Sequence, residues 1–471
     1  MVDVMSEMDV FFHPKSVAII GASDSLKFGY GTTKYLLNSK FKTYPVNIKK
    51  QEIHGHKAYR NIKDVPDEIE LAIIIVGNEH VLQAVKDCVE KGVKGIVIEA
   101  AGFAETGIEK YVNIQKEIEQ IAKESNVRIM GPNCIGLTNF NNQFTTADLD
   151  FDQVVKGEIA VVAQSGVLGN IFIDWAFDQG IGFSKAITIG NKVDVDEVDL
   201  LQYLNNDHET KVITLYLEGT KRGKAFRNTL RKMKKPVLIL KNGKSEIGSK
   251  AVNSHTGSIA GNDKIYNALI KQNAGIFRVN NFYEMFNIAQ VFATQPLPKG
   301  KNVAIITGSG SLGALACDEI EKQNLNLAKL SETTINTIKS VIPNWVSIRG
   351  TIDLGPSLFQ TFIPSTKAIF EDKGVDCILY IFSVPRWPLQ SYGKMGSKII
   401  NEHFSLVKEL SIKYNKPFIC VCFGSRWTFN FLKKAVSQSK TEVIIPIMTR
   451  VKHAIKAFKM MCEFRKIKKL D

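Results

Sequence analysis

The strongest constraint on the fold is a repeated alternation of short apolar runs with stretches of helical periodicity. In the first part of the chain, four apolar runs end near Gly21, Val76, Ala100 and Gly131. Helical segments separate them, such as residues 80–92, in which apolar residues recur every three or four positions. This alternation predicts an α/β fold with a parallel, doubly wound sheet, whose ligands bind outside the carboxyl ends of the strands.

The same unit of strand, small-residue turn and helix returns twice further along the chain. It reads AVVAQSGVLGNIFID from Ala160 and NVAIITGSGSLGALACDEI from Asn302. At roughly 150 residues per domain, 471 residues correspond to about three domains. The sequence therefore predicts three doubly wound domains, over residues 1–142, 143–294 and 295–471. The polar stretch 142–157 and the proline-rich QPLPKG, residues 295–300, are the expected linkers.

The composition of the chain argues against several classes of partner and location. The formal net charge is +14, but no zinc finger or RNA-binding aromatic motif accompanies it, so a solvated basic surface is expected and no nucleic acid. No apolar run approaches the ~20 residues that span a bilayer, and the first residues lack the basic start of a signal peptide. The seven cysteines form no CxxC pair, which predicts a reducing cytoplasm, no disulfides and no metal site.

A glycine-rich turn, GASDSLKFGYG, follows the first apolar run. Such a turn lets backbone N–H groups approach a phosphate at a helix N-terminus, although an ordinary tight turn is the alternative. Its spacing is not the dinucleotide fingerprint, and the next strand is followed by Asn47, Lys49 and Lys50 rather than an acid. Basic residues there favour a phosphorylated ribose, as in coenzyme A (CoA), over NAD. The candidate CoA-binding residues, with one from the turn GPNCIG, are Gly21, Ala22, Ser23, Gly29, Lys49 and Asn133.

His255 lies in a segment, SKAVNSHTGSIAGND, that is rich in glycine and hydroxyl residues. These small residues, among them Thr256 and Gly257, leave room and donors around an imidazole that takes up and releases a phosphate. The strand VITLYLEG ends in Glu218, at the same predicted sheet edge. A carboxylate bonded to one imidazole nitrogen fixes the tautomer and frees the other nitrogen to attack. A histidine that merely caps a helix is the alternative.

A second candidate phosphate site is the strand-to-helix turn formed by Gln164, Ser165 and Gly166. The helix that begins there offers free N–H groups and the positive end of its dipole.

Other chemically suggestive residues are expected to be structural. Cys134 has no evident base beside it, so packing is preferred to catalysis. Asp196 and its acidic neighbours are expected to cap a helix rather than bind a metal. Cys420 and Cys422 share one face of a predicted strand and are expected to be packing residues.

Together, these motifs resemble one enzyme family along nearly the whole chain. The chain resembles the α subunit of ADP-forming acetyl-CoA synthetases, the NDP-forming acyl-CoA synthetases related to succinyl-CoA synthetase. The segments that carry the resemblance are SVAIIGAS, YPVNIK, GPNCIG, AQSGVLG, LYLEG, SHTGSIAG and QPLPKG. The pair LYLEG and SHTGSIAG is the most specific, and the glycine-rich turn alone is not.

The resemblance implies a Rossmann-like CoA-binding domain followed by two flavodoxin-like domains. It further implies that His255 is phosphorylated, that Glu218 is its carboxylate partner, and that the turn at Ser165 and Gly166 holds the phosphoryl group. The implied reaction is reversible: acyl-CoA, phosphate and ADP give acid, CoA and ATP through an acyl phosphate and phospho-His255. ATP, ADP and Mg²⁺ are expected on a separate ATP-grasp β subunit, in an α2β2 assembly.

The third domain departs from the family pattern. It reads GSGSLG in place of a GGPG-type turn, and IRGTIDLG, residues 348–355, in place of an Asn-Pro-x-Asp segment. A non-catalytic CoA-binding or regulatory protein that kept the fold is therefore the second hypothesis. An NAD-dependent dehydrogenase is disfavoured because the dinucleotide fingerprint is missing. Neither the acid that is activated nor the physiological direction can be read from the sequence.

Overall fold

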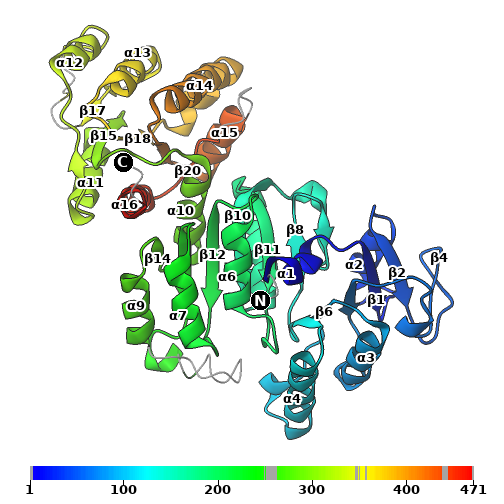
Figure 1. Ribbon diagram of the computed structural model, residues 1–471. Helices are drawn as coiled ribbons and strands as arrows, with labels where there is room; N and C mark the ends of the chain where they lie inside the picture. Colours follow the sequence, from blue (N-terminus) through cyan, green and yellow to red (C-terminus); the bar gives the residue numbers. More distant parts are fainter. Residues whose placement is uncertain are drawn as a thin grey trace. The chain divides into compact units, whose positions relative to one another are not determined.

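The computed structural model describes residues 4–248, 250, 263–344, 348, 351–355, 358–437 and 444–468. The chain divides into two compact units, Met1–Met285 and Phe286–Asp471. Figure 1 follows both from the blue N-terminus to the red C-terminus. Across the described residues, no helix has the length and apolar character required to cross a membrane.

The first sheet is parallel and has the strand order β2-β1-β5-β6-β7. The winding reverses between β1 and β5, the switch point at which open α/β sheets bind ligands. Small elements between β2 and β6 are β3 (Glu52–Ile53), β4 (His56–Lys57) and η1 (Ile62–Asp64). The main elements are β1 (Ser16–Ile20), α2 (Tyr30–Leu37), β2 (Lys42–Val46), β5 (Leu71–Ile74), α3 (Asn78–Lys91), β6 (Gly95–Ile98), η2 (Ala104–Thr106), α4 (Glu109–Glu124) and β7 (Arg128–Met130).

The second sheet has the order β14-β13-β12-β10-β11-β8-β9. Its parallel strands repeat the winding of the first sheet, and the switch point lies between β10 and β12. The elements are β8 (Leu137–Asn139), β9 (Phe144–Thr145), η3 (Phe151–Gln153), β10 (Lys156–Ala163), α5 (Gly166–Gln179), β11 (Phe183–Thr188), α6 (Glu197–Asn206), β12 (Val212–Leu217), α7 (Gly223–Lys232), β13 (Val237–Lys241), α9 (Asp263–Gln272) and β14 (Ile276–Arg278).

The antiparallel strands β8 and β9 were not predicted from the sequence. β8 pairs with β11 and with β9, so part of the expected linker 142–157 belongs to the second sheet. Both strands are too short to show a hydrophobic period, and their Thr138 and Thr145 hydroxyls bond to each other at 2.8 Å. The boundary expected at residue 142 falls between these two strands, and the division into three domains stays a prediction.

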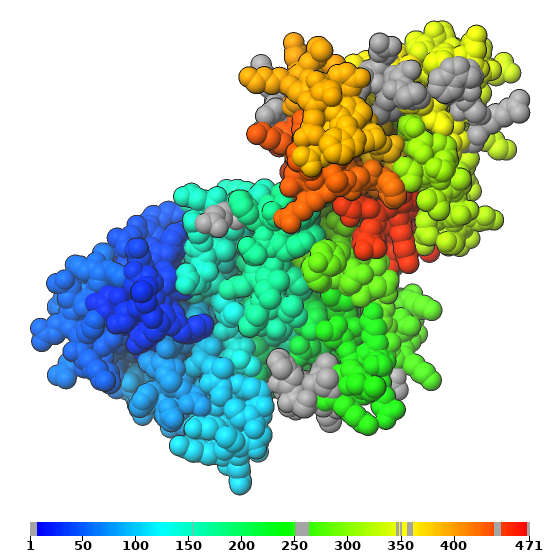
Figure 2. Space-filling model, turned by 180° about the vertical axis from the view of Figure 1, so that it is seen from behind, coloured from blue at the N-terminus to red at the C-terminus, as the bar shows by residue number. Residues whose placement is uncertain are grey.

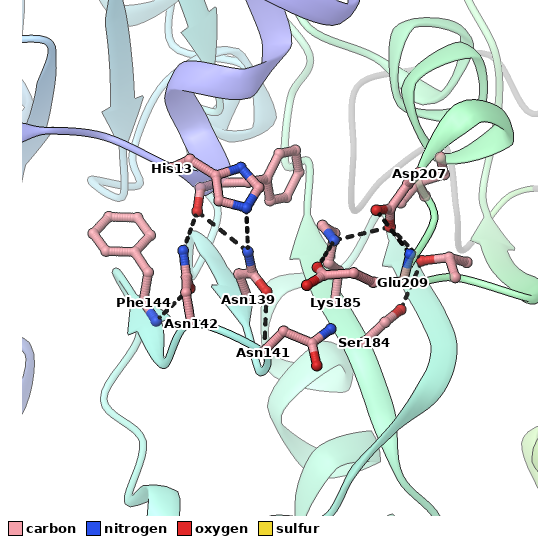
Figure 3. A network of polar contacts seen from close by, with 12 residues as sticks. His13, Asn139, Asn141, Asn142, Phe144, Ser184, Lys185, Asp207 and Glu209 are labelled. Carbon is pink, nitrogen blue, oxygen red and sulfur yellow. Dashed lines mark hydrogen bonds and ion pairs between the residues drawn. The ribbon is translucent and has the colours of Figure 1, made fainter.

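Helix α1 (Val4–Phe12) precedes the first sheet in sequence but packs on the second. The Phe12 ring stacks on Tyr203 of α6 with centroids 4.6 Å apart. The backbone carbonyl of Phe12 accepts hydrogen bonds from the side chains of Asn139 at 3.3 Å and Asn142 at 2.8 Å. Figure 3 shows the His13 ring above Asn139 in this network. The blue and cyan-to-green residues of the first unit accordingly form one continuous surface in Figure 2.

A buried ion pair stabilises the second sheet at the edge opposite its switch point. Lys185 of β11 is fully buried, and its Nζ donates to Asp207 at 2.8 Å and to Glu209 at 2.7 Å (Figure 3). The neighbouring Ser184 and Thr210 hydroxyls are 2.7 Å apart. These contacts hold the loop between α6 and β12 and serve the fold rather than the site.

The second unit contains a third sheet with the order β16-β15-β18-β19-β20, and β17 pairs beside β15. This order again reproduces the winding of the first two sheets, so the predicted repetition of one unit is confirmed. Cys420 and Cys422 are buried in β19, as predicted for packing residues. The elements are α10 (Phe282–Thr294), which begins in the first unit, and β15 (Asn302–Thr307), α11 (Gly310–Lys322), β16 (Asn326–Leu327), α12 (Glu332–Lys339), β17 (Ile352–Asp353), α13 (Leu358–Glu371), β18 (Cys377–Phe382), α14 (Arg386–Tyr414), β19 (Phe418–Cys422), α15 (Arg426–Ser437), β20 (Ile447–Met448) and α16 (Val451–Ile467).

Candidate active site

A cleft of about 540 Å³, here called the first cleft, lies in the first unit where the ligand edges of its two sheets meet. The first sheet contributes residues that follow β5, β6 and β7, and the second sheet contributes residues that follow β10, β11 and β12. The predicted site residues that line it are Asn133, Gln164, Ser165, Gly166 and Glu218. One cleft therefore brings together a candidate CoA-binding residue, the candidate phosphate turn and the candidate catalytic carboxylate.

The turn at Ser165 is built as the start of a helix. Ser165 has extended backbone angles, φ −87° and ψ 126°, and α5 begins at Gly166. A Cβ on Gly166 would lie 3.0 Å from Cγ1 of Ile135, so glycine allows the helix end to approach the turn that follows β7. The first N–H groups of a helix have no partner within it, and here they border the cleft. This arrangement fits an anion.

Gln164 joins the two strands at the switch point of the second sheet. Its backbone N–H donates to the carbonyl of Tyr216 at 3.1 Å. Its Oε1 accepts from the backbone N–H groups of Glu218 at 2.9 Å and Gly219 at 3.1 Å. Because this oxygen is engaged, the amide nitrogen is the part of the side chain that can donate to an anion in the cleft.

Glu218 directly follows β12 and is 5% exposed. The Tyr216 hydroxyl donates to Oε1 of Glu218 at 3.2 Å, and the Asn242 amide donates to that hydroxyl at 2.6 Å. Burial, followed by the charge of Glu218, raises the pKa of Tyr216, so its hydroxyl stays a donor. This relay orients the carboxylate at the edge where the chain between β13 and α9 leaves the sheet.

The predicted phosphohistidine segment lies in that connection. His255, Thr256 and Gly257 are outside the described residues. Their roles therefore stay predictions, and the described structure includes the candidate carboxylate Glu218 and the candidate phosphate turn.

The predicted CoA residues divide between two clefts. Gly21 and Lys49 line a second cleft of about 480 Å³ at the switch point of the first sheet. Gly21 has φ +95°, and a Cβ there would lie 2.9 Å from Cγ1 of Val76, so this turn requires glycine. The two clefts share the lining residues Ile75, Val76 and Gly77, so they are neighbours.

Three further CoA candidates shape the turn rather than line either cleft. The Ala22 carbonyl accepts from the Asn47 side chain at 2.8 Å, and the Ser23 hydroxyl accepts from the N–H of Ser25 at 3.1 Å. Gly29 has φ +82° and precedes α2. Asn133 lies in the first cleft instead, where its amide donates to Asn191 at 3.3 Å.

Two residues of the first cleft were missed from the sequence. Glu99 follows β6 and is 5% exposed. Burial raises the pKa of Glu99 to about 8. A hydrogen bond from Thr146 acts in the opposite direction, and the charge of Asp148 adds to the increase. Asn191 follows β11 and is held by Glu105 at 2.6 Å and Gln115 at 2.9 Å. The available signal for Glu99 was an acid near the end of the apolar run GIVIEA, residues 95–100. Nothing local marked Asn191.

Asp196 and Cys134, which were expected to be structural, have structural contacts. Asp196 caps α6, and Asp199 closes a capping box with it. Cys134 is buried, its thiol donates to the carbonyl of Ile98 at 3.3 Å, and burial raises its pKa. A thiol held in its protonated form is a poor nucleophile. Within the described ranges, no cluster of three or more histidine, cysteine, aspartate or glutamate residues could hold a metal ion.

Comparison with known proteins agrees with this geometry. Residues 15–139 match the family described as CoA binding domain, and residues 156–292 match the succinyl-CoA ligase like flavodoxin domain. The chain is 43% identical over 383 residues to the acetate–CoA ligase [ADP-forming] II subunit alpha of Pyrococcus furiosus, covering 80% of this chain and 83% of that one. It is 35% identical over 420 residues to the 4-hydroxybutyrate–CoA ligase [ADP-forming] of Nitrosopumilus maritimus, covering 87% of this chain and 58% of that longer one.

A solved structure is similar along almost the whole chain. The dinucleotide forming acetyl-coenzyme A synthetase 1 of Candidatus Korarchaeum cryptofilum, in complex with phosphate and ADP, has a TM-score of 0.87 and 28% identity. The match covers 98% of this chain and 97% of that one. The fold and these relatives together define an acid–CoA ligase. The chain belongs to the ADP-forming acetate–CoA ligase family, to which alpha subunits such as the one from Pyrococcus furiosus also belong.

Proposed function

We propose that this chain is the CoA-binding, phosphohistidine-bearing subunit of an ADP-forming acid–CoA ligase of the acetate type. The observation that carries the proposal is the first cleft, in which Gln164, Ser165, Gly166 and Glu218 of the second sheet face Asn133 of the first. The candidate phosphate turn and the candidate carboxylate partner of His255 thus line one cleft with a candidate CoA residue. A purely regulatory CoA-binding role is not favoured, because the relatives reported above are named as ligases.

The two neighbouring clefts together suit CoA. Lys27, Lys49 and Arg60 line the second cleft, and these cations suit the phosphates of CoA. The shared residues Ile75–Gly77 would lie beside the pantetheine arm, which carries the thioester into the first cleft. Asn133 offers an amide there, held in place through Asn191.

The chemistry follows from what borders the thioester. Phosphate bound at the N-terminus of α5 attacks the acyl carbon, giving acyl phosphate and free CoA. His255 then takes the phosphoryl group from the acyl phosphate and releases the acid. Glu218, held by Tyr216, stabilises the imidazolium that results. Thr256 and Gly257 would supply donors beside the phosphorylated ring.

A partner subunit completes the reaction. The relative from Pyrococcus furiosus is named as a subunit, and we infer a partner here as well. An ATP-grasp β subunit would bind ADP and ATP with Mg²⁺, in an α2β2 assembly and in the cytoplasm. Acetate is the first substrate to test. The relative named for 4-hydroxybutyrate makes a short hydroxy acid the second.

The test is coupled synthesis of ATP. The chain, combined with an ATP-grasp partner, is expected to make ATP from acetyl-CoA, phosphate, ADP and Mg²⁺. Calorimetry on the chain alone is expected to detect CoA and not NAD. Binding of CoA without ATP synthesis from any short-chain acyl-CoA would instead support the regulatory role.

A further inference from the structure

Glu99 is a buried carboxyl group of the first cleft that the steps above do not use. The Thr146 hydroxyl accepts from the N–H of Leu137 at 3.0 Å and donates to the Glu99 carboxyl. Oε1 of Glu99 is buried and, by geometry, has no hydrogen-bond partner among the described residues. A buried oxygen without a partner is costly when the carboxyl group is charged, and protonation of the group lowers this cost.

The surroundings of Glu99 are shaped to keep this carboxyl in place. Gly136 has φ +76°, and a Cβ there would lie 1.7 Å from the Thr146 hydroxyl and 3.1 Å from Oε1 of Glu99. Any side chain at this position would therefore displace the pair. The space beside Oε1 depends on a glycine in a left-handed conformation that other residues rarely adopt.

The charge balance favours a protonated carboxyl. The ionisable groups that act on Glu99 are Asp148 and the Cys134 thiol, and Glu218 is the other carboxyl group that lines this cleft. The described residues that line this cleft include no lysine, arginine or histidine. Burial raises the pKa of Glu99 to about 8, so at neutral pH the group is a carboxylic acid with a proton to donate.

The position of Glu99 in the cleft indicates which atom would receive its proton. On the proposed function, the thioester of CoA would reach the first cleft past Ile75–Gly77, which line both clefts, and phosphate would bind at Ser165 and Gly166. Glu99 lines the same cleft as Ser165 and Gly166. The geometry points to Glu99 as the general acid that protonates the departing CoA sulfur, a role that rests on the proposed function.

The step balances without a further reactant. A phosphate oxygen of HPO₄²⁻ forms a bond to the acyl carbon while the carbon–sulfur bond breaks and its electron pair goes to sulfur. Glu99 gives its proton to that sulfur, which leaves as the thiol of CoA. The Glu99 carboxylate then receives the proton of the attacking phosphate. In the reverse direction, the carboxylate takes the thiol proton as sulfur attacks the acyl phosphate.

The experiment compares two phosphoryl donors on the full-length chain carrying Glu99→Gln. Labelled phosphate with acetyl-CoA requires cleavage of the carbon–sulfur bond, whereas labelled acetyl phosphate does not. Labelling from acetyl-CoA is expected to fall by about 100-fold or more, the usual scale for loss of an acid catalyst. Labelling from acetyl phosphate is expected to remain within about threefold. Glu117→Gln, a 57% exposed carboxylate on α4, is the matched control and should change neither.

Two readouts separate proton transfer from a structural role. Glu99→Gln should bind CoA as tightly as the parent chain, because glutamine preserves the shape and accepts the Thr146 hydrogen bond. The acetyl-CoA-dependent rate of the parent should fall as the pH rises through about 8, and the variant should lack this decline. Equal losses with both donors, or no loss with acetyl-CoA, would overturn the inference. A parent chain labelled by neither donor would overturn the proposed function first.

Discussion

Gln164 provides the sharpest test of how the fold positions the site. Its Oε1 accepts two backbone N–H groups, at 2.9 and 3.1 Å, from the residues that follow β12. Gln164→Leu keeps the volume and removes the acceptor. Each buried N–H left unpaired costs about 1–3 kcal/mol, so the closed turn would lose roughly 2–6 kcal/mol. The turn is therefore expected to open and to take Glu218 out of position.

Hydrogen–deuterium exchange of the 212–220 peptide measures this opening directly. Since 1.4 kcal/mol is a factor of ten, exchange at Glu218 and Gly219 should accelerate by roughly 25-fold or more. Phosphorylation of the chain should decrease as well, because Glu218 is displaced. Gln164→Glu restores an accepting oxygen and should recover slow exchange, but its negative charge should repel phosphate and keep labelling low.

The control and the refutation are equally specific. Gln120→Leu changes an exposed glutamine on α4 and should alter neither exchange nor labelling. Unchanged exchange in Gln164→Leu would refute the view that this side chain holds the two strand ends together. Full labelling of Gln164→Glu would show that the Gln164 amide does not face the phosphate.

Two further predictions concern CoA binding and stability. Gly21→Val places a Cβ 2.9 Å from Val76 at φ +95°, and calorimetry should show CoA affinity at least about tenfold weaker, with Gly223→Ala, whose added Cβ meets nothing, unchanged. Lys185→Met leaves Asp207 buried without its cation and should destabilise the chain by about 3–5 kcal/mol near pH 7 in urea unfolding. Burial alone would raise the pKa of Asp207, but Lys185 and Thr210 hold it below its usual value, so this stabilisation is present above the unfolded pKa and is lost as the pH falls. The difference between parent and variant should therefore narrow below about pH 4, and a constant difference would contradict the assignment.

The parallel sheets and their ligand edges could be predicted because buried parallel strands give apolar runs and their carboxyl ends share one edge. Gln164, Ser165, Gly166 and Glu218 were found in this way, and the structure places all four on one cleft. Strands β8 and β9 could not be predicted, because they have three and two residues and show no period.

The content of each cleft was less accessible to sequence reasoning. Asn133 was grouped with the CoA turn, yet it faces the first cleft because the turn after β7 reaches the second sheet. The burial of Glu99 depends on Thr146 and Gly136, which lie far from it in sequence. Its altered pKa is a property of the packed site and is invisible in the run GIVIEA.

The central claim is that this chain carries phosphate on His255. The most direct measurement is incubation of the purified chain with radiolabelled phosphate and acetyl-CoA, beside His255→Ala. The account predicts label that is labile in acid and stable in base, absent from His255→Ala and strongly reduced in Glu218→Gln. Label that persists in His255→Ala, or a chain that binds CoA and takes up no label with its ATP-grasp partner present, would contradict it.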